Sequence, residues 1–534
     1  MKAKMNTVRC FTISGSPAGG ENKRMPQDLT PIQPFPVEGK GFGSAPPLDG
    51  EDTGGVNRGR SVLLNKHSRL RRVLIGLLAT VWLSGCLLGP DYKRPSVGIP
   101  SQFRAATTSQ VDSIADLKWF EVFRDEHLQE LIRVAVSQNY DLRDAIARVE
   151  AARANLVITR SNQFPNFGAG ADVTSQELSR QGEFTIPKGV GRQRTYGEVF
   201  LNLFTFEIDI WGRLRRATEA AQAELLASDW NRKEVIRTLI SDVATAYFNL
   251  LELDMELEIA RNTLGTRQES LRLLRTQLGG GVGTLLDVRQ GEQLVYTAAQ
   301  VIPDDERQTE QTENLVSLLL GKNPGPVARG SLMTVQQTPP EIPAGLTSAL
   351  LERRPDIHAA EQILIAANAN IGVAKAAYFP RITLTGEFGF QSTALASLFS
   401  GPRRFWSFIP QITQPIFTAG RLRSQVELAE AQQRSALAQY ENAIQSAFRD
   451  VSDALIQYQK IREIRAQRES LVTSLQDRTR LAYLRFRGGV DTMLNALNSD
   501  QDLFSAELSL AQARRDELLS LVQVYKALGG GWQE

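Results

Sequence analysis

Apolar and polar residues alternate along two segments of the chain, residues 200–211 and 382–390. In the second segment Ile382, Leu384 and Phe388 are separated by threonine and glutamate residues. A period of two with one apolar face is typical of a β-strand. Weaker alternation at residues 166–176 and 405–417 predicts two further strands.

Strands of about ten residues, apolar on one side and polar on the other, have the pattern of a transmembrane β-barrel wall. A soluble sheet with two different faces is the alternative. Four strands are too few to close into a barrel, so either structure needs partner chains to cover its edges.

Helical patterns lie between these strands. Apolar residues within 128–135 fall on one helix face. Alanine-rich stretches at residues 141–159 and 356–378 predict two more helices, each followed by a Phe-Pro pair at 164–165 or 379–380. Because proline restricts the residue before it, we expect each pair to end its helix and turn the chain.

A duplication organises the chain. The tetrapeptide Gly-Arg-Leu-Arg occurs at 212–215 and again 208 positions later at 420–423, and the same offset relates Gly-Gly-Val at 280–282 to 488–490. No proline interrupts either interval, so each predicts a helix about 100 Å long. We therefore predict two tandem repeats, residues 119–330 and 331–534.

The ends of the return helices are predicted from proline and glycine. A helix starting near Thr284 is expected to end at Pro303, and the proline- and glycine-rich residues 321–344 predict a linker between the repeats. The second repeat has no proline after Pro415 and reaches three glycines at 529–531, which suit a helix stop.

An export signal precedes the repeats. Four basic residues between 66 and 72 are followed by an apolar run at 73–83 and by Leu-Ser-Gly-Cys at 83–86, which is typical of a bacterial lipobox. We expect Cys86 to be acylated and to become the mature N-terminus; an uncleaved signal is the alternative. Leu87, in place of aspartate, favours transfer to the outer membrane.

The neighbouring segments complete this domain plan. Residues 1–60, rich in Gly, Pro, Ser and Asn, are predicted to be disordered or a mis-annotated extension. Residues 61–85 form the signal peptide, and residues 86–118 an acylated, extended tether.

Composition excludes several other classes. The net charge of +2 offers no bulk attraction to nucleic acid, and Cys10 and Cys86 provide no disulfide framework. The three histidines have no metal-site spacing, and no nucleophile elbow or phosphate loop occurs. We expect no enzyme, no metal and no cofactor besides the covalent lipid on Cys86.

These motifs together resemble the outer-membrane factor family, in particular its NodT-type efflux lipoproteins related to TolC and OprM. The lipobox and the duplicated tetrapeptides carry the resemblance in order along the chain. The other motifs that carry it are Pro90, Tyr92, Arg94 and Pro95, then Trp119, Phe120, Phe123 and Asp125, then Arg354, Pro355, Asp356, Ile357, Ala360, Glu361, Ile371 and Gly372, and the pair Phe379-Pro380.

The resemblance implies an α+β membrane protein that forms a homotrimer. Each chain would give four strands to a twelve-stranded barrel in the outer-membrane lipid, continued by a long helical barrel through the periplasm. The implied function is the exit duct of a tripartite efflux pump for small molecules, with a periplasmic adaptor and an inner-membrane RND-type transporter. A type I protein secretion duct is the alternative, and a lipid-anchored coiled-coil scaffold is the rival outside this class.

The resemblance also implies sites. The deepest periplasmic tips, which meet the adaptor in this family, match Gly280, Gly281, Val282, Gly283, Thr284, Gly488, Gly489, Val490 and Thr492. A polar stripe after the second tip predicts the pore aperture, with a solvated outer face as the alternative. Its candidate residues are Asp491, Asn495, Asn498 and Asp502, with Asp287 from the first repeat.

This chain departs from the family at the aperture. Asn495 and Asn498 occupy the positions of the family's carboxylates. A ring of amides narrows a pore without a strong negative field. We therefore expect an aperture that depends less on pH and divalent cations, with residual cation selectivity from Asp491 and Asp502.

Overall fold

The computed structural model describes residues 87–104, 113–181, 185–336, 343–345 and 347–533. All of them belong to the second of the chain's two units, Leu74–Glu534. The predicted N-terminal extension, the export signal and Cys86 lie outside the described residues.

One antiparallel sheet contains all four predicted strands in the order β1-β2-β3-β4. The strands are β1 (Phe167–Glu177), β2 (Gln193–Ile208), β3 (Arg381–Ser392) and β4 (Arg404–Thr413). Within the described chain, β1 and β4 each pair with a neighbour on one side only. The sheet therefore has two open edges.

The strand register separates an apolar from a polar face. Ile208 pairs with Ile382, which pairs with Ile412. The adjacent position aligns Glu207, Thr383 and Gln411 in the same way. Because successive side chains point to opposite faces, the first three residues share one face and the polar residues share the other. This is the predicted amphipathic wall.

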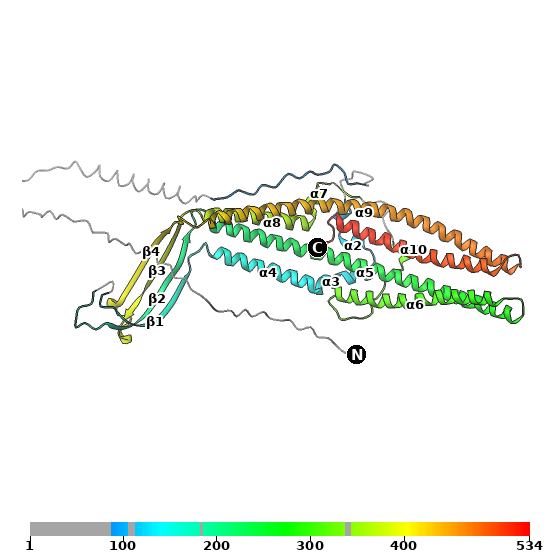
Figure 1. Cartoon of the computed structure of the whole chain (residues 1–534), viewed down its shortest axis with the longest axis horizontal. Coiled ribbons are helices and arrows are strands. Elements are labelled where there is room, and N and C mark those ends of the chain that lie inside the picture. The colour runs from blue at the N-terminus through cyan, green and yellow to red at the C-terminus, as the bar shows by residue number, and fades with distance from the viewer. Residues whose placement is uncertain (1–86, 105–112, 182–184, 337–342, 346, 534) are drawn as a thin grey trace, which may run out of the picture. The chain divides into compact units, whose positions relative to one another are not determined.

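Two pairs of helices continue the strands (Figure 1). α4 (Tyr140–Ser161) and α8 (Pro355–Ala376) precede β1 and β3, while α5 (Arg213–Gly279) and α9 (Arg421–Arg487) follow β2 and β4. α5 and α9 have 67 residues each and turn back into α6 (Leu285–Leu319) and α10 (Met493–Ala527). The two predicted long helices are confirmed.

The first of these long helices has a side-chain cap. The Asp209 carboxylate accepts hydrogen bonds from the backbone N–H groups of Leu214 and Arg215, at 3.2 and 2.9 Å. The first N–H groups of a helix have no partner inside the helix, so a carboxylate there satisfies them.

Short elements connect the repeats. α3 (Glu126–Gln138) starts at Asp125, whose carboxylate accepts from the N–H groups of His127 and Leu128. The predicted linker runs over α5, where Arg329 pairs with Asp254 at 3.0 Å. The remaining short elements are η1 (Ile114–Asp116), α2 (Trp119–Val122), η2 (Met333–Val335), α7 (Ala349–Arg353), η3 (Leu395–Ser397) and η4 (Gly401–Arg403).

The predicted end of the return helix at Pro303 is wrong, because α6 continues through this residue to Leu319. Proline lacks an N–H group and crowds the preceding turn, which costs about 3 kcal/mol inside a helix. Pro303 is exposed, whereas Val295, Ala298 and Val316 on the same helix are buried. We infer that packing of this buried side outweighs the local cost.

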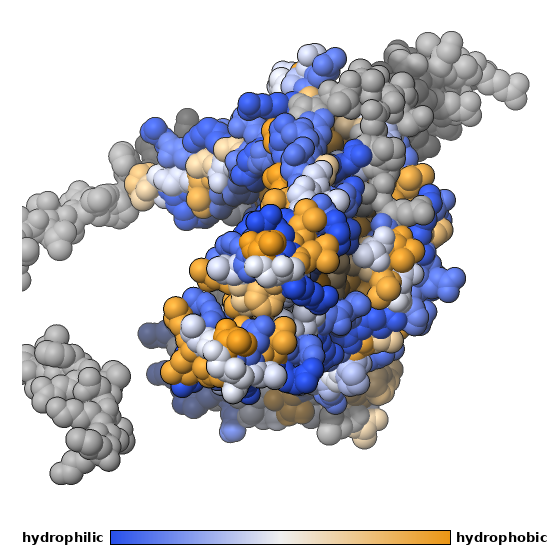
Figure 2. Space-filling model, turned by 90° about the vertical axis from the view of Figure 1, so that its right-hand side faces the viewer, coloured by the Kyte–Doolittle hydropathy of each residue, from blue (hydrophilic) through white to orange (hydrophobic). Residues whose placement is uncertain are grey.

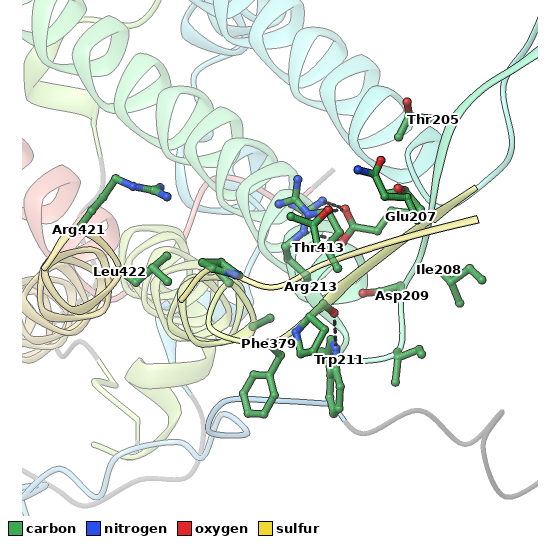
Figure 3. Close-up of a pocket in the computed structure, with 18 residues that line it drawn as sticks. Thr205, Glu207, Ile208, Asp209, Trp211, Arg213, Phe379, Thr413, Arg421 and Leu422 are labelled. Atoms are coloured by element: carbon green, nitrogen blue, oxygen red, sulfur yellow. Dashed lines mark hydrogen bonds and ion pairs between the residues drawn. The ribbon is translucent and has the colours of Figure 1, made fainter. Parts of the chain in front are cut away.

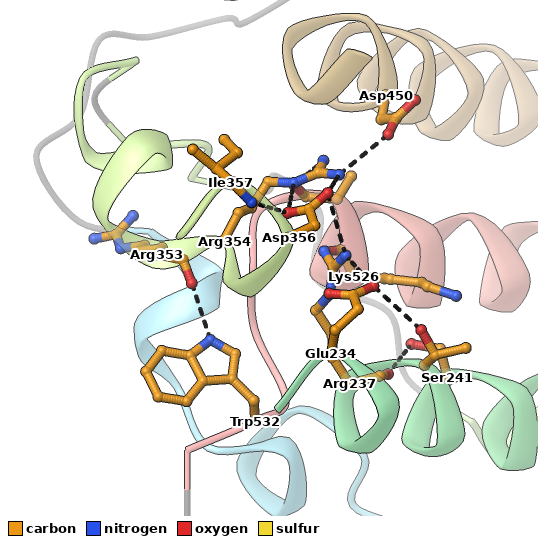
Figure 4. A network of polar contacts seen from close by, with 12 residues as sticks. Glu234, Arg237, Ser241, Arg353, Arg354, Asp356, Ile357, Asp450, Lys526 and Trp532 are labelled. Carbon is orange, nitrogen blue, oxygen red and sulfur yellow. Dashed lines mark hydrogen bonds and ion pairs between the residues drawn. The ribbon is translucent and has the colours of Figure 1, made fainter. Parts of the chain in front are cut away.

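The main core joins both repeats. It contains Tyr247 of α5, Tyr440 of α9 and Tyr525 of α10, all essentially buried. A polar network at its edge connects the same helices (Figure 4). Arg354 donates to Asp356 at 2.6 Å, to Asp450 at 3.3 Å and to the carbonyl of Ala527 at 3.2 Å. The Arg-Pro-Asp motif is therefore a structural junction.

Residues 87–104 of the predicted tether contain no helix or strand and are bound along the helices, whereas Ile114–Asp116 of the same predicted segment form η1. Tyr92 donates to Glu361 at 2.9 Å, and Arg94 pairs with Glu352 and Glu361 at 2.6 and 3.0 Å. The buried Arg216 donates to the carbonyl of Leu88 at 3.1 Å. These contacts explain why the tether carries a tyrosine and an arginine.

The described helices include none with the length and apolar character needed to cross a membrane.

Candidate functional site

The two hairpin turns have matching backbones. Gly281 and Gly489 adopt positive φ values of 75° and 70°. At the first turn, the N–H groups of Val282 and Gly283 donate to the carbonyl of Gln277, at 3.0 and 3.1 Å. A side chain strains a backbone with positive φ, so the second glycine of each pair is the one that the turn requires.

Apolar side chains are exposed at both turns. Val282 is 83% exposed and Val490 is 67% exposed, and Leu285 and Leu286 are exposed beside the first turn. Apolar and hydrophilic patches are interspersed on this end of the helices (Figure 2). Both turns therefore present apolar side chains to solvent in the single chain.

Asp287 and Thr284 form a capping box at the start of α6. The Asp287 carboxylate accepts from the N–H and hydroxyl of Thr284 at 3.0 and 2.6 Å, and the Asp287 N–H donates to the Thr284 hydroxyl at 3.2 Å. This reciprocal pair satisfies two helix-end donors. The candidate aperture residue Asp287 therefore has a capping role in the described chain.

The predicted aperture stripe is on the surface of α10. Asn495, Asn498 and Asp502 are exposed and Asp491 is half-buried. Leu497 and Phe504 on the same helix are buried, whereas Leu494 is 42% exposed in the single chain.

Both carboxylates of the stripe have cationic partners on α9. Asp491 pairs with Arg485 at 3.1 Å and accepts from the Asn495 amide at 2.6 Å, while Asp502 pairs with Arg478 at 2.8 Å. The Asn495 amide, the Thr492 N–H and Arg485 hold the pKa of Asp491 below its ordinary value. Nearby arginines offset much of the negative field that these two residues contribute.

Behind the stripe, the two hairpins share a buried contact that the sequence analysis missed. Arg267 of α5 pairs with Asp500 of α10 at 2.7 Å, and their side chains are 1% and 10% exposed. Arg267 also donates to the Leu294 carbonyl at 2.8 Å and to Gln501 at 3.1 Å. One arginine thereby joins α5, α6 and α10 near the tips.

The sequence contains a signal for Asp500, one of the two residues of this ion pair. Met493, Ala496 and Leu497 form an apolar line on α10 that Asp500 and Phe504 continue at helical spacing. These apolar residues are buried, and the first three pack with apolar residues of α5 and α6. A charged residue within such a line indicates a buried partner, although it cannot identify Arg267.

A second missed cluster lies farther from the tips. Glu252, Glu256 and Asp305 are buried, and Arg515 donates to both Glu252 oxygens at 2.8 Å. One Asp305 oxygen has no hydrogen-bond partner within the described chain. Burial, followed by repulsion from Glu252 and Asp305, raises the pKa of Glu256 to about 7, and burial raises that of Asp305 to about 6.

Where the sheet meets the helices, there is a cavity of about 400 Å³ (Figure 3). Glu207 on its wall pairs with Arg213 at 2.8 Å and with Arg381 at 3.2 Å. Trp211 donates to the Pro380 carbonyl at 2.8 Å. The Phe-Pro turn is thereby tied to the strand that enters α5.

The described residues contain no group of three or more His, Cys, Asp or Glu side chains that could hold a metal ion.

An amphipathic four-stranded sheet continued by two long helical hairpins defines an outer-membrane channel of the efflux type. The family model described as "Outer membrane efflux protein" matches residues 131–322 and 346–530. The chain belongs to this family.

Named relatives agree with this assignment. The toluene efflux pump outer membrane protein TtgF of Pseudomonas putida is 39% identical over 471 residues, which cover 86% of this chain and 96% of TtgF. Outer membrane protein OprJ of Pseudomonas aeruginosa is 35% identical over 463 residues, which cover 86% of this chain and 95% of OprJ.

A solved structure supports the fold. The MtrE outer membrane channel of Neisseria gonorrhoeae, in its open state, matches with a TM-score of 0.77 and 34% identity, covering 84% of this chain and 99% of MtrE. The family resemblance, the predicted fold class and the outer-membrane location are confirmed. The chain is the outer-membrane exit duct of an efflux pump.

Proposed function

We propose that three copies of this chain close into one twelve-stranded barrel and a continuous helical duct. The observation that carries this proposal is the pair of open sheet edges on an amphipathic four-stranded sheet. Lipid does not tolerate unpaired strand edges, and a cyclic assembly removes them. Chemical cross-linking in mild detergent is expected to end at a trimer. A stable monomer with full strand content would contradict the proposal.

The duct works with a periplasmic adaptor and an inner-membrane RND-type transporter. Support comes from the exposed Val282 and Val490 at the two turns and from the relatives' names as pump components. We expect site-specific photo-cross-linkers at Val282 to capture an adaptor in cells. Capture that is unchanged after Gly281→Val and Gly489→Val would argue against docking at the turns.

Small organic molecules are the proposed cargo, because TtgF is named for toluene and other relatives for antibiotics and solvents. Deleting the gene should raise the intracellular accumulation of such compounds, and the intact gene should reverse it. Loss of a secreted protein with unchanged accumulation of small compounds would instead support the type I secretion alternative. The chain is a passive conduit in this proposal and catalyses no reaction.

Acylation of Cys86 anchors the mature chain, and no other cofactor is required. Support comes from the residues next to it, since the Leu88 N–H donates to the Trp211 carbonyl at 3.2 Å, at the junction of sheet and helices. An acyl group two residues away would start near the membrane surface. Several acyl chains together anchor a protein stably, at about 0.8 kcal/mol per buried CH₂.

At the aperture, Asn495 and Asn498 form a ring of amides that narrows the pore. The pairing of Asp491 with Arg485 and of Asp502 with Arg478 supports weak dependence on divalent cations. Single-channel recording tests this with calcium added at the periplasmic side. Strong block at low millimolar calcium that survives Asp491→Asn and Asp502→Asn would refute it and would point to Asp287.

A further inference from the structure

The two copies of the Gly-Arg-Leu-Arg motif have different electrostatic environments. In the first copy, Arg213 pairs with Glu207 through two hydrogen bonds at 2.9 and 2.8 Å, and Arg215 pairs with Asp209 at 3.3 Å. The offset of 208 relates Arg213 to Arg421. The same cavity contains both arginines.

The second copy has no carboxylate at either equivalent position. The offset of 208 replaces Glu207 by Pro415 and Asp209 by Phe417. Arg421 is exposed, and no carboxylate of the described chain forms an ion pair with it. Arg421 therefore has no equivalent of Glu207, the carboxylate that pairs with Arg213.

The cavity lies on the polar face of the sheet. Thr383 and Gln411, which line it, continue the row of Glu207 across the strands, while Ile382 and Ile412 occupy the opposite face. In a transmembrane barrel the polar face points to the interior and the apolar face to lipid. In the channel, this cavity therefore opens toward the lumen at the base of the barrel.

The charges around this cavity do not balance. The cavity is lined by two carboxylates, Glu207 and Asp209, and by three guanidinium groups, those of Arg213, Arg381 and Arg421. Each chain thus contributes an excess of one positive charge to the lining of this cavity. Figure 3 shows Arg213 and Arg421 entering the region from separate helices.

Farther from the helices, the same polar face of the sheet contains a group of negatively charged side chains. Asp172 of β1 pairs directly with Glu198 of β2, and Glu387 of β3 pairs with Asn202, so three carboxylates share the interior face above the junction. Arg194 of β2, which pairs with Gln176, lies on this face still farther from the helices, so the three carboxylates separate it from the arginines at the junction.

We propose that Arg421, with Arg213 and Arg381, forms a cationic collar that attracts anions, including phosphate- and carboxylate-bearing solutes, at the base of the barrel. The proposal rests on closure of the chain into a channel. A ring of one charge sign selects ions in a pore because it raises the local concentration of counter-ions. Arg421 is the specificity-determining member, because its charge has no partner in the described chain.

Reversal potentials in a potassium chloride gradient test this with the full-length protein in planar bilayers. Arg421→Gln should lower the anion-to-cation permeability ratio about twofold at 0.1 M salt, as expected for three screened charges lining one pore. Arg421→Lys should retain the wild-type ratio. Arg423→Gln is the matched control, because Arg423 pairs with Glu427 at 2.8 Å on the same helix.

The repeat itself provides a second variant that leaves the arginine in place. Pro415→Glu gives the second copy a carboxylate at the position equivalent to Glu207. This variant should lower the anion-to-cation permeability ratio, as Arg421→Gln does. Inorganic phosphate added at the extracellular side should reduce the wild-type current more than that of either variant. This side reaches the barrel without passing the periplasmic aperture.

A readout that needs no conduction is iodide quenching of Trp211, which lines the cavity. The contribution of Trp211 to the quenching is the difference between a protein with Trp211 and the same protein with Trp211→Phe. This difference should be smaller when both proteins also carry Arg421→Gln. If conductance and trimers persist but both variants keep the wild-type ratio and quenching, the collar is refuted and Arg421 instead faces lipid or the neighbouring subunit. Loss of all conductance in the wild type would refute the channel rather than the collar.

Discussion

Replacing Arg267 by methionine is expected to loosen the contact between the two hairpins at the tips. The change removes the guanidinium that pairs with Asp500 at 2.7 Å and the donors to Leu294 and Gln501. Methionine keeps much of the aliphatic volume, so the loss is mainly electrostatic. Asp500 remains buried without its partner.

The magnitude follows from burial. Removing one partner of a buried ion pair costs about 3–5 kcal/mol, because a desolvated charge is left uncompensated. Both side chains here are at least nine-tenths buried. Arg272→Met is the matched control, since Arg272 pairs with Glu269 on the same helix while both side chains are more than 60% exposed. An exposed pair contributes about 1 kcal/mol or less.

Hydrogen exchange along α10 measures the local free energy of opening. We expect Arg267→Met to accelerate exchange around Asp500 by about two to three and a half orders of magnitude, since about 1.4 kcal/mol corresponds to tenfold. In planar bilayers, the same variant should spend more time in conducting states, because α9 and α10 separate more easily from α5.

The double variant Arg267→Met/Asp500→Leu separates an unpaired charge from lost packing. It removes both charges, so exchange should return toward the wild-type rate. The reasoning would be refuted if the single variant exchanged like Arg272→Met, or if the double variant remained as fast as the single one.

Three further predictions concern other parts of the chain. The pKa values of Glu256 and Asp305 are raised to about 7 and about 6, so the folded state binds more protons than the unfolded state. The free energy of unfolding should therefore fall as pH rises from about 4 to 7. Glu256→Gln should flatten this pH dependence in thermal unfolding curves. Gly281→Val combined with Gly489→Val should abolish efflux in an accumulation assay while trimers persist, because a β-branched residue strains a backbone with positive φ; full efflux would contradict this. Mass spectrometry should find diacylglycerol on Cys86, whereas an unmodified chain that starts upstream would exclude acylation.

Some features of this protein are determined by short-range sequence signals. The alternation in 382–390 and 200–211, the Phe-Pro pairs and the glycines at the tips all act on the backbone within a few residues. Such signals correctly predicted the strands, the long helices and their turns. The duplication alone orders these elements into two repeats.

Other features depended on the tertiary structure. Local sequence predicts a stop at Pro303, but distant packing of the buried side of α6 carries the helix onward. Arg267 and Asp500 are 233 positions apart, so their pairing cannot be found from neighbouring residues. Arg213 and Arg421 occupy equivalent positions in the repeat, yet within the described chain Arg213 pairs with a carboxylate and Arg421 does not. Burial and charge pairing depend on which distant segments meet, and for that reason only the folded chain decides them.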